Sequence, residues 1–284
     1  MCAVGSASRE PDTTSAIVPS VTGNPGGLVV TATQNHEAPP ISPDITVRPI
    51  HRAPKRLPYP LSIYQSSVGK KWVMAITGIM MMGFVLFHMI GNAKMYLGPV
   101  EYNAYAEGLR TFGEPLLPRR WFLWILEIGL MGAFVLHLHS AYSLTMLNRR
   151  SRGVKTKRDY IAANFASLTM RYSGIILLAF IGFHLLTLTF GKGGPAMPDY
   201  VDGDVYGNVV NTLSVWWVAV IYIISNLALG VHLFHGAWSI FQSLGVNNPR
   251  FNGLRRGFAI GFAAIVCGVN ISFPIAVLTG VVGN

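Results

Sequence analysis

Six histidines of this sequence lie inside long apolar stretches, where ionisable side chains are rare and usually functional. A neutral imidazole binds metal ions and haem iron through a ring nitrogen, so histidines in such stretches indicate metal or haem chemistry. A single histidine there is often a hydrogen-bonded structural residue, but six of them favour a shared cofactor. The six are His88, His137, His139, His184, His232 and His235.

The elements that must position these histidines are apolar stretches near the length of about 20 residues that a spanning helix needs. The chain has 284 residues and is 12% charged, whereas soluble domains are about 25% charged. We therefore predict an all-α membrane protein with five transmembrane helices, and we exclude nucleic-acid binding despite the net charge of +10. The stretches run approximately over residues 71–96, 121–147, 171–190, 213–244 and 258–282.

Residues 1–64 differ from the rest, because they are rich in Ser, Thr, Pro, Asn and Gly and lack a sustained apolar period. We expect a disordered tail there, without a secretory signal peptide. Of the 22 Lys and Arg residues, 17 lie before the first stretch, between the second and third, between the fourth and fifth, or at the first position of the first and third stretches. The positive-inside rule then puts the N-terminus and tail in the cytoplasm and the C-terminus outside, in a bacterial inner membrane.

Helix direction sorts the histidines into two levels. His88 and His184 lie about 25 Å and 20 Å from the inner ends of their helices, which places both in the outer half. His137 lies about 18 Å from the inner end of its helix, and His235 lies closer still. One histidine from each of two helices at each level predicts a bundle of the first four helices holding two haems b, each with two histidine ligands.

The choice of inner ligands stays open on geometry alone. His137 and His139 are about 200° apart around a helix, so only one can face the core. His232 and His235 are about 60° apart and could both face inward. A zinc site would need its ligands at one level, and a proton relay would carry more Asp or Glu than these helices do.

Five motifs in order along residues 65–284 make this region similar to the cytochrome b membrane anchor of succinate dehydrogenase and fumarate reductase. The resemblance is to the type with one anchor subunit, five helices and two haems, and it implies a five-helix transmembrane cytochrome b domain. The motifs are FHMIGN at 87–92, YNAYAE at 102–107, the run 137–148, MRYSG at 170–174 with FHL at 183–185, and HLFHGAWS at 232–239 with FQ at 241–242.

The resemblance implies ligands for each of the two haems. His88 and His184 would bind the iron of the distal haem, near the outer face. His137 and His235 would bind the iron of the proximal haem, with His139 and His232 as alternatives. Some members of the family carry a glutamate linked to proton movement two positions before the ligand in helix four. The corresponding residue here is Leu233, so no proton path is expected through that position.

The resemblance also implies an electron-transfer subunit of a succinate:quinone oxidoreductase. A flavoprotein subunit would oxidise succinate or reduce fumarate, and an iron–sulfur subunit would pass electrons to the proximal haem. From there they would reach the distal haem and a quinone, expected to be menaquinone, near the outer face. The chain has no flavin motif and only two cysteines, so it would perform no dehydrogenase chemistry alone.

Several polar residues at helix ends are candidates for further contacts. The candidates for quinone binding are Glu101, Tyr102 and Glu107. The candidates for binding haem propionates by charge-assisted hydrogen bonds are Lys94, Arg171 and Tyr172. The basic connection at 149–158 could dock the iron–sulfur subunit, and a higher oligomer of the complex is left open. Two rival functions remain: a dihaem cytochrome b of another quinone-linked dehydrogenase, and a haem-free transporter or scaffold.

Overall fold

The computed structural model describes residues 57–59, 61–151, 161–197, 199–246 and 248–283. Within the chain, Lys55–Asn284 forms one compact unit, which contains all of the described residues. The predicted disordered tail lies outside the described residues, except near its end, where the short helix α1 (Leu61–Gln65) forms. The basic connection between the second and third spans also lies largely outside them.

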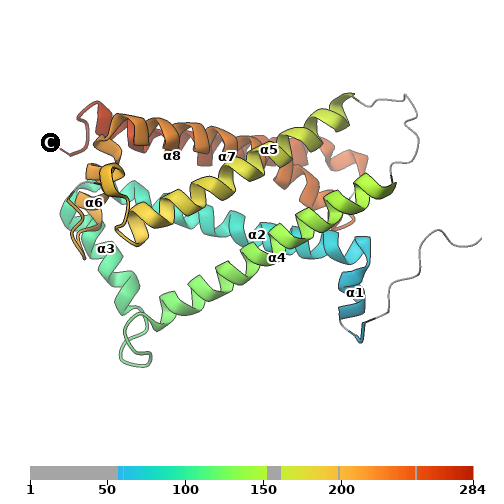
Figure 1. Cartoon of the computed structure of the whole chain (residues 1–284), viewed down its shortest axis with the longest axis horizontal. Helices are drawn as coiled ribbons and strands as arrows, with labels where there is room; N and C mark the ends of the chain where they lie inside the picture. The colour runs from blue at the N-terminus through green and yellow to red at the C-terminus, as the bar shows by residue number, and fades with distance from the viewer. Residues whose placement is uncertain (1–56, 60, 152–160, 198, 247, 284) are drawn as a thin grey trace, which may run out of the picture. The chain divides into compact units, whose positions relative to one another are not determined.

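Five helices are long and apolar enough to cross a membrane, and no strand occurs in the part of the chain that the structure describes. This confirms the predicted all-α membrane fold (Figure 1). A 3₁₀ turn (Ala93–Leu97) extends the first of these helices, and a π-helical segment (Leu185–Thr189) extends the third. The five helices are α2 (Ser67–Asn92), α4 (Trp121–Ser151), α5 (Ile161–His184), α7 (Trp216–Ser243) and α8 (Asn252–Leu278).

Two further helices occupy connections in which the sequence analysis assigned no helix. They are α3 (Pro99–Thr111), with Pro at its start, and α6 (Val205–Ser214). Figure 1 shows both at one end of the unit, opposite α1; we call this the α3–α6 end. The predicted stretch 213–244 was therefore wrong at its start. The extended backbone of Val215 (φ −76°, ψ 104°) separates α6 from α7, so Leu213 and Ser214 end the shorter helix.

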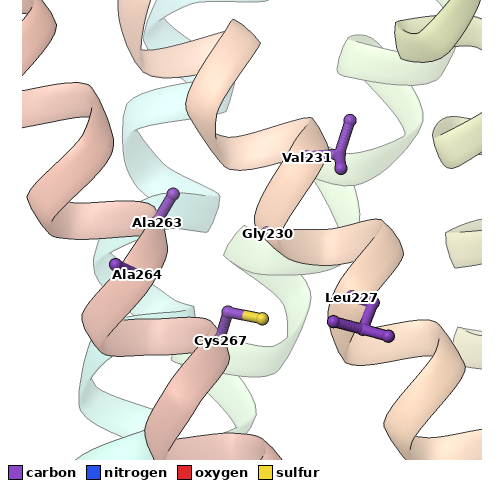
Figure 2. A pocket seen from close by; sticks show the side chains of 6 residues that line it. All are labelled: Leu227, Gly230, Val231, Ala263, Ala264 and Cys267. Carbon is purple, nitrogen blue, oxygen red and sulfur yellow. The ribbon is translucent and has the colours of Figure 1, made fainter.

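Helix α7 is central to the packing, because it contacts α5, α2 and, most extensively, α8. Gly230 allows the close approach of α7 and α8: a Cβ atom there would lie 3.1 Å from both Cβ and Sγ of Cys267. Beside this contact is an open apolar groove of about 260 Å³ lined by residues of α7 and α8 (Figure 2). None of the histidines lines the groove. Its lining residues are Leu227, Gly230, Val231, Ala263, Ala264 and Cys267.

The turn between α7 and α8 is tied down by Arg255, which is only 5% exposed. Its guanidinium donates to the carbonyl oxygens of Val246 and Asn248 and lies 5.6 Å from the ring centre of Trp238. A charge is costly to bury without partners, and these carbonyl groups and the ring face stabilise it. The bonds hold the start of α8 against the end of α7.

Candidate functional site

The histidines nearest the α3–α6 end come together from two helices. His88 of α2 and His184 of α5 have ring centroids 5.9 Å apart, with the ring planes at 87°. Two imidazoles that bind one metal ion through nitrogens about 2 Å from it have centroids about 6 Å apart. The separation therefore fits two axial ligands of one iron. Phe84, one turn before His88, stacks on its ring at 5.2 Å.

The Nδ1 atom of His184 lies 3.1 Å from the hydroxyl oxygen of Tyr222, on α7. Tyr222 in turn hydrogen-bonds the side chain of Thr187, in the π-helical segment that follows His184. The Thr187 hydroxyl donates to the carbonyl oxygens of Phe183 (3.0 Å) and His184 (3.2 Å). The carbonyl oxygens accept from Thr187, and the Tyr222 hydroxyl can accept from Nδ1–H of His184, as ligation through Nε2 requires. His184 then keeps its Nε2 lone pair for a metal ion.

The second level contains His137 of α4. Its Nδ1 atom lies 3.2 Å from the carbonyl oxygen of Met74 and 3.2 Å from the hydroxyl oxygen of Thr77, both on α2. The Thr77 hydroxyl donates its own proton to the carbonyl oxygen of Val73 at 2.7 Å. Both partners therefore accept from Nδ1, and Nε2 of His137 is again the nitrogen left for a ligand. Gly78 leaves space beside the ring, because a Cβ atom there would lie 3.6 Å from Cε1.

His232 of α7 has the same kind of hydrogen bond at its Nδ1 atom. Its Nδ1 atom lies 3.1 Å from the hydroxyl oxygen of Ser173 on α5, and Ser173 donates to the carbonyl oxygen of Met170 at 3.2 Å. His232 also interacts electrostatically with both His137 and His235. His235 packs instead against Phe234, with ring centroids 5.0 Å apart.

His139, the alternative to His137, is engaged elsewhere. Its Nδ1 atom lies 2.5 Å from the hydroxyl oxygen of Tyr64 in α1, which is also 3.1 Å from the Ser140 hydroxyl oxygen. The side chain of His139 is exposed, and its ring packs on Tyr64 at 5.7 Å between centroids. The pair fastens α1 to α4.

The histidines could bind either a zinc ion or the iron of a haem, and the two differ in the number of protein ligands. Among the described residues, no group of three or more His, Cys, Asp or Glu is arranged to hold a metal ion. Zinc sites use three or four protein ligands, whereas a haem with both axial positions filled needs one pair. A pair of imidazoles such as His88 and His184 suits a haem better than zinc, and the Nδ1 atoms of His137, His184 and His232 each have an oxygen within hydrogen-bond distance.

The quinone candidates lie on α3, at the α3–α6 end. Tyr102 is buried and donates from its hydroxyl to Oδ1 of Asn92 at 2.6 Å, and burial raises its pKa. Glu107 forms ion pairs with Arg119 at 2.7 Å and Arg110 at 3.6 Å. Glu101, in the first turn of α3, is exposed. The three side chains have different surroundings, and Glu101 is the most accessible of them.

A hydrogen-bonded clasp ties α3 to α6. The Nδ2 atom of Asn103 donates to Oδ1 of Asp204 at 2.9 Å, and its Oδ1 accepts from the backbone N–H of Tyr206 at 2.9 Å. Asp204 also caps α6 by accepting from the backbone N–H of Gly207 at 3.0 Å. The bonds from Gly207 and then Asn103 lower the pKa of the Asp204 carboxyl.

The residues that are candidates for binding haem propionates lie at both histidine levels. Lys94 lies in the 3₁₀ turn after α2, near the level of His88. Arg171 and Tyr172 lie directly before Ser173, the partner of His232, and Tyr172 is 62% exposed. One cation at the outer level and one at the inner level is an arrangement that could pair with the carboxylates of two haems.

Sequence reasoning missed the hydroxyl partners of the histidines and the clasp at the α3–α6 end. Thr77 lies near the middle of its span and Tyr222 in the first third of its own, but such residues are common in membrane helices. Only the register between two helices makes them partners of a histidine, and a single sequence does not contain that register.

The chain was compared with known proteins. Residues 148–271, a little under half of the chain, match the family model of the succinate dehydrogenase/fumarate reductase transmembrane subunit. Searches of curated proteins and of solved structures found no match. The matched region contains His184, Tyr222 and His232 and ends within α8. Both the match and the five apolar helices support an integral membrane subunit of a succinate dehydrogenase or fumarate reductase.

Proposed function

We propose that this chain is the cytochrome b anchor of a succinate:quinone oxidoreductase and holds two haems b between histidines of four helices. The observation that carries the proposal is the pairing of imidazoles from different helices, with Nδ1 hydrogen bonds that leave Nε2 for a ligand. The family match over residues 148–271 supports the coarser statement of a membrane subunit in such a complex.

His88 and His184 are the proposed ligands at the outer level, and His137 is the first ligand at the inner level. For the second inner ligand we now favour His232 over His235. The Nδ1 atom of His232 is held by Ser173, whereas His235 packs against its sequence neighbour Phe234. His139 is bound to α1 and is not proposed as a ligand.

Each haem b, when bound, would supply a one-electron couple. The chain's own contribution is to hold the imidazoles of His137, His184 and His232 by hydrogen bonds at Nδ1 and to space the two levels along the bundle. Lys94 and Arg171 are the proposed partners of the haem propionates, and Tyr172 is a weaker candidate because it is exposed. Phe180 packs beside His184 with ring centroids 5.8 Å apart, and Phe183 packs against the same hydrophobic cluster, so the surroundings of the outer level are apolar.

The proposed partners are a flavoprotein subunit and an iron–sulfur subunit at the α1 end, which the positive-inside rule assigns to the cytoplasm of a bacterium. The proposed electron acceptor is a quinone, with menaquinone as the candidate, near the α3–α6 end. Glu101 is the exposed carboxylate of α3 and is proposed to exchange protons with the quinone. Tyr102 stays protonated, since burial raises its pKa, and Glu107 is held by two arginines.

The proposal is tested on the full complex purified from the membrane in mild detergent. We expect two b-type haems per copy of this chain in the reduced-minus-oxidised spectrum, co-purification of a flavoprotein and an iron–sulfur protein, and reduction of a menaquinone analogue by succinate. His88→Ala and His184→Ala should each remove one haem and retain the other. His139→Ala is the matched control and should retain both.

Each rival function predicts a different outcome. Purified chain without b-type absorbance would reject the haem proposal and favour a transporter or scaffold. Two haems without succinate-dependent quinone reduction, and with a different dehydrogenase bound, would identify the cytochrome b of another complex. Loss of both haems in His88→Ala, with expression retained, would reject independent levels.

A further inference from the structure

The outer ligand His184 is held by a residue from another helix. Tyr222 lies on α7, is 8% exposed, and approaches Nδ1 of His184 with its hydroxyl at 3.1 Å. The relay continues through Thr187 to carbonyl oxygens of α5. His184 on α5 is thus connected through α7 back to its own helix, and its ring orientation depends on both helices.

The backbone after His184 is arranged for this relay. Residues Leu185–Thr189 form a π-helical segment, in which the N–H of Phe190 bonds the carbonyl oxygen of Leu185 at 2.9 Å. π-Helical turns occur frequently at functional sites. Here the segment carries Thr187, whose fully buried hydroxyl donates to the backbone and also contacts Tyr222.

The Tyr222 ring is fixed by contacts that do not involve its hydroxyl. Phe180 meets the ring edge-on, with centroids 4.9 Å apart and an interplanar angle of 88°, and Phe183 lies 6.4 Å away. The Tyr222 carbonyl oxygen accepts a hydrogen bond from the side chain of Asn226 at 2.8 Å. A phenylalanine at position 222 would keep the aromatic contacts and lose the hydroxyl that approaches His184 and Thr187.

We propose that Tyr222 is the positioning residue of the outer haem ligand and sets the reduction potential of that haem. The inference rests on the proposed function, because it needs a haem between His88 and His184. A hydrogen bond accepted from Nδ1–H fixes the histidine tautomer and raises its basicity as a ligand. A more basic ligand stabilises the oxidised iron, so loss of the bond raises the midpoint potential.

The test is a redox titration of the visible spectrum of the whole complex carrying Tyr222→Phe, with two haems resolved. Removal of a hydrogen-bond partner of a ligand changes metal affinity or activity on the order of 10–100-fold. A tenfold change in the one-electron equilibrium is a shift of 59 mV. We expect the outer component to shift upward by about that amount, with the inner component unchanged and both haems retained.

Three variants calibrate the result. Tyr96→Phe is the matched control: the Tyr96 hydroxyl lies 2.6 Å from the Ser272 hydroxyl oxygen at the same end, outside the histidine relays, and should shift neither component. Ser173→Ala should shift only the inner component, since Ser173 holds His232. His88→Ala assigns the components, because the haem that remains is the inner one.

The outcomes separate the inference from the proposed function. A complex without haem would reject the proposed function itself. Two haems whose potentials are both unchanged in Tyr222→Phe, or both shifted equally, would overturn the role of Tyr222 while leaving the ligands in place. Low-spin ferric electron paramagnetic resonance signals give a second readout: only the outer haem's signal should change in Tyr222→Phe.

Discussion

The clasp between α3 and α6 allows the sharpest test of how the α3–α6 end is held. Asn103→Ala removes the bond to the Asp204 carboxylate and the bond from the Tyr206 backbone N–H. A hydrogen bond to a charged group contributes about 1.5–3 kcal/mol and a neutral bond about 0.5–1.5 kcal/mol. Because Asn103 is only partly buried and water replaces some of both bonds, we take a loss of about 2 kcal/mol.

That loss predicts faster local opening of α6. A free energy of 2 kcal/mol corresponds to roughly a 30-fold change in an equilibrium constant. Amides of α6 that exchange by local opening should therefore exchange about 30-fold faster in Asn103→Ala, as measured by hydrogen-exchange mass spectrometry on the intact complex. Amides in the centre of α7 should be unchanged. The haem spectrum should also be unchanged, since the clasp touches none of the histidines.

A second variant gives the same test a pH signature. Asn103→Asp keeps an acceptor for Tyr206 but places a carboxylate within about 3 Å of Asp204, and like charges that close repel. Exchange from α6 should be fast at neutral pH and should slow as acid protonates one of the two carboxyls. The reasoning would be refuted if Asn103→Ala left α6 exchange within threefold of the parent chain, or if Asn103→Asp had no pH dependence.

Three further predictions concern the inner ligands, the packing of α7, and pH. His232→Ala should remove the inner haem whereas His235→Ala retains it; haem quantification checks this, and the reverse result would return His235 to the site. Gly230→Val should destabilise the complex by about 1–3 kcal/mol through overpacking, measured as a lower thermal midpoint. Gly257→Val on α8 is the control and should leave the midpoint unchanged, because a Cβ atom there meets open space. Because hydrogen bonds lower the pKa of Asp204, its stabilisation of α6 is fully present above pH of about 4 and is lost as the pH falls through the lowered pKa; amide exchange between pH 6 and 3 checks the sign.

The spanning helices were predictable because apolarity over about 20 residues has one common cause, burial in lipid. The short helices were not. α3 carries Glu101, Glu107 and Arg110 and has no sustained apolar run, so it was taken for a loop. The apolar residues on both sides of Val215 hid the break between α6 and α7, which depends on the extended backbone at that residue.

For the candidate site, sequence supplied the histidines and their approximate depth, but not their partners. The preference for His235 came from a resemblance, and it remains untested. What now favours His232 is a contact with Ser173, 59 positions away in the chain. Tyr222 is a parallel case, since its hydroxyl reaches a histidine 38 positions earlier. Such contacts depend on the rotation and height of one helix against another, which periodicity within each helix does not determine.

The dependence of both levels on α7 has a consequence for biogenesis. His88, His137 and His184 are synthesised and inserted before α7 emerges, but the outer level still lacks Tyr222 and the inner level still lacks His232. Helix α5 is therefore inserted into the bilayer before α7, its main packing partner, has been synthesised. The inner level therefore cannot be completed until α7 has been translated. Both proposed ligands of the outer level are present earlier, but His184 gains its hydrogen-bond partner only when Tyr222 is inserted.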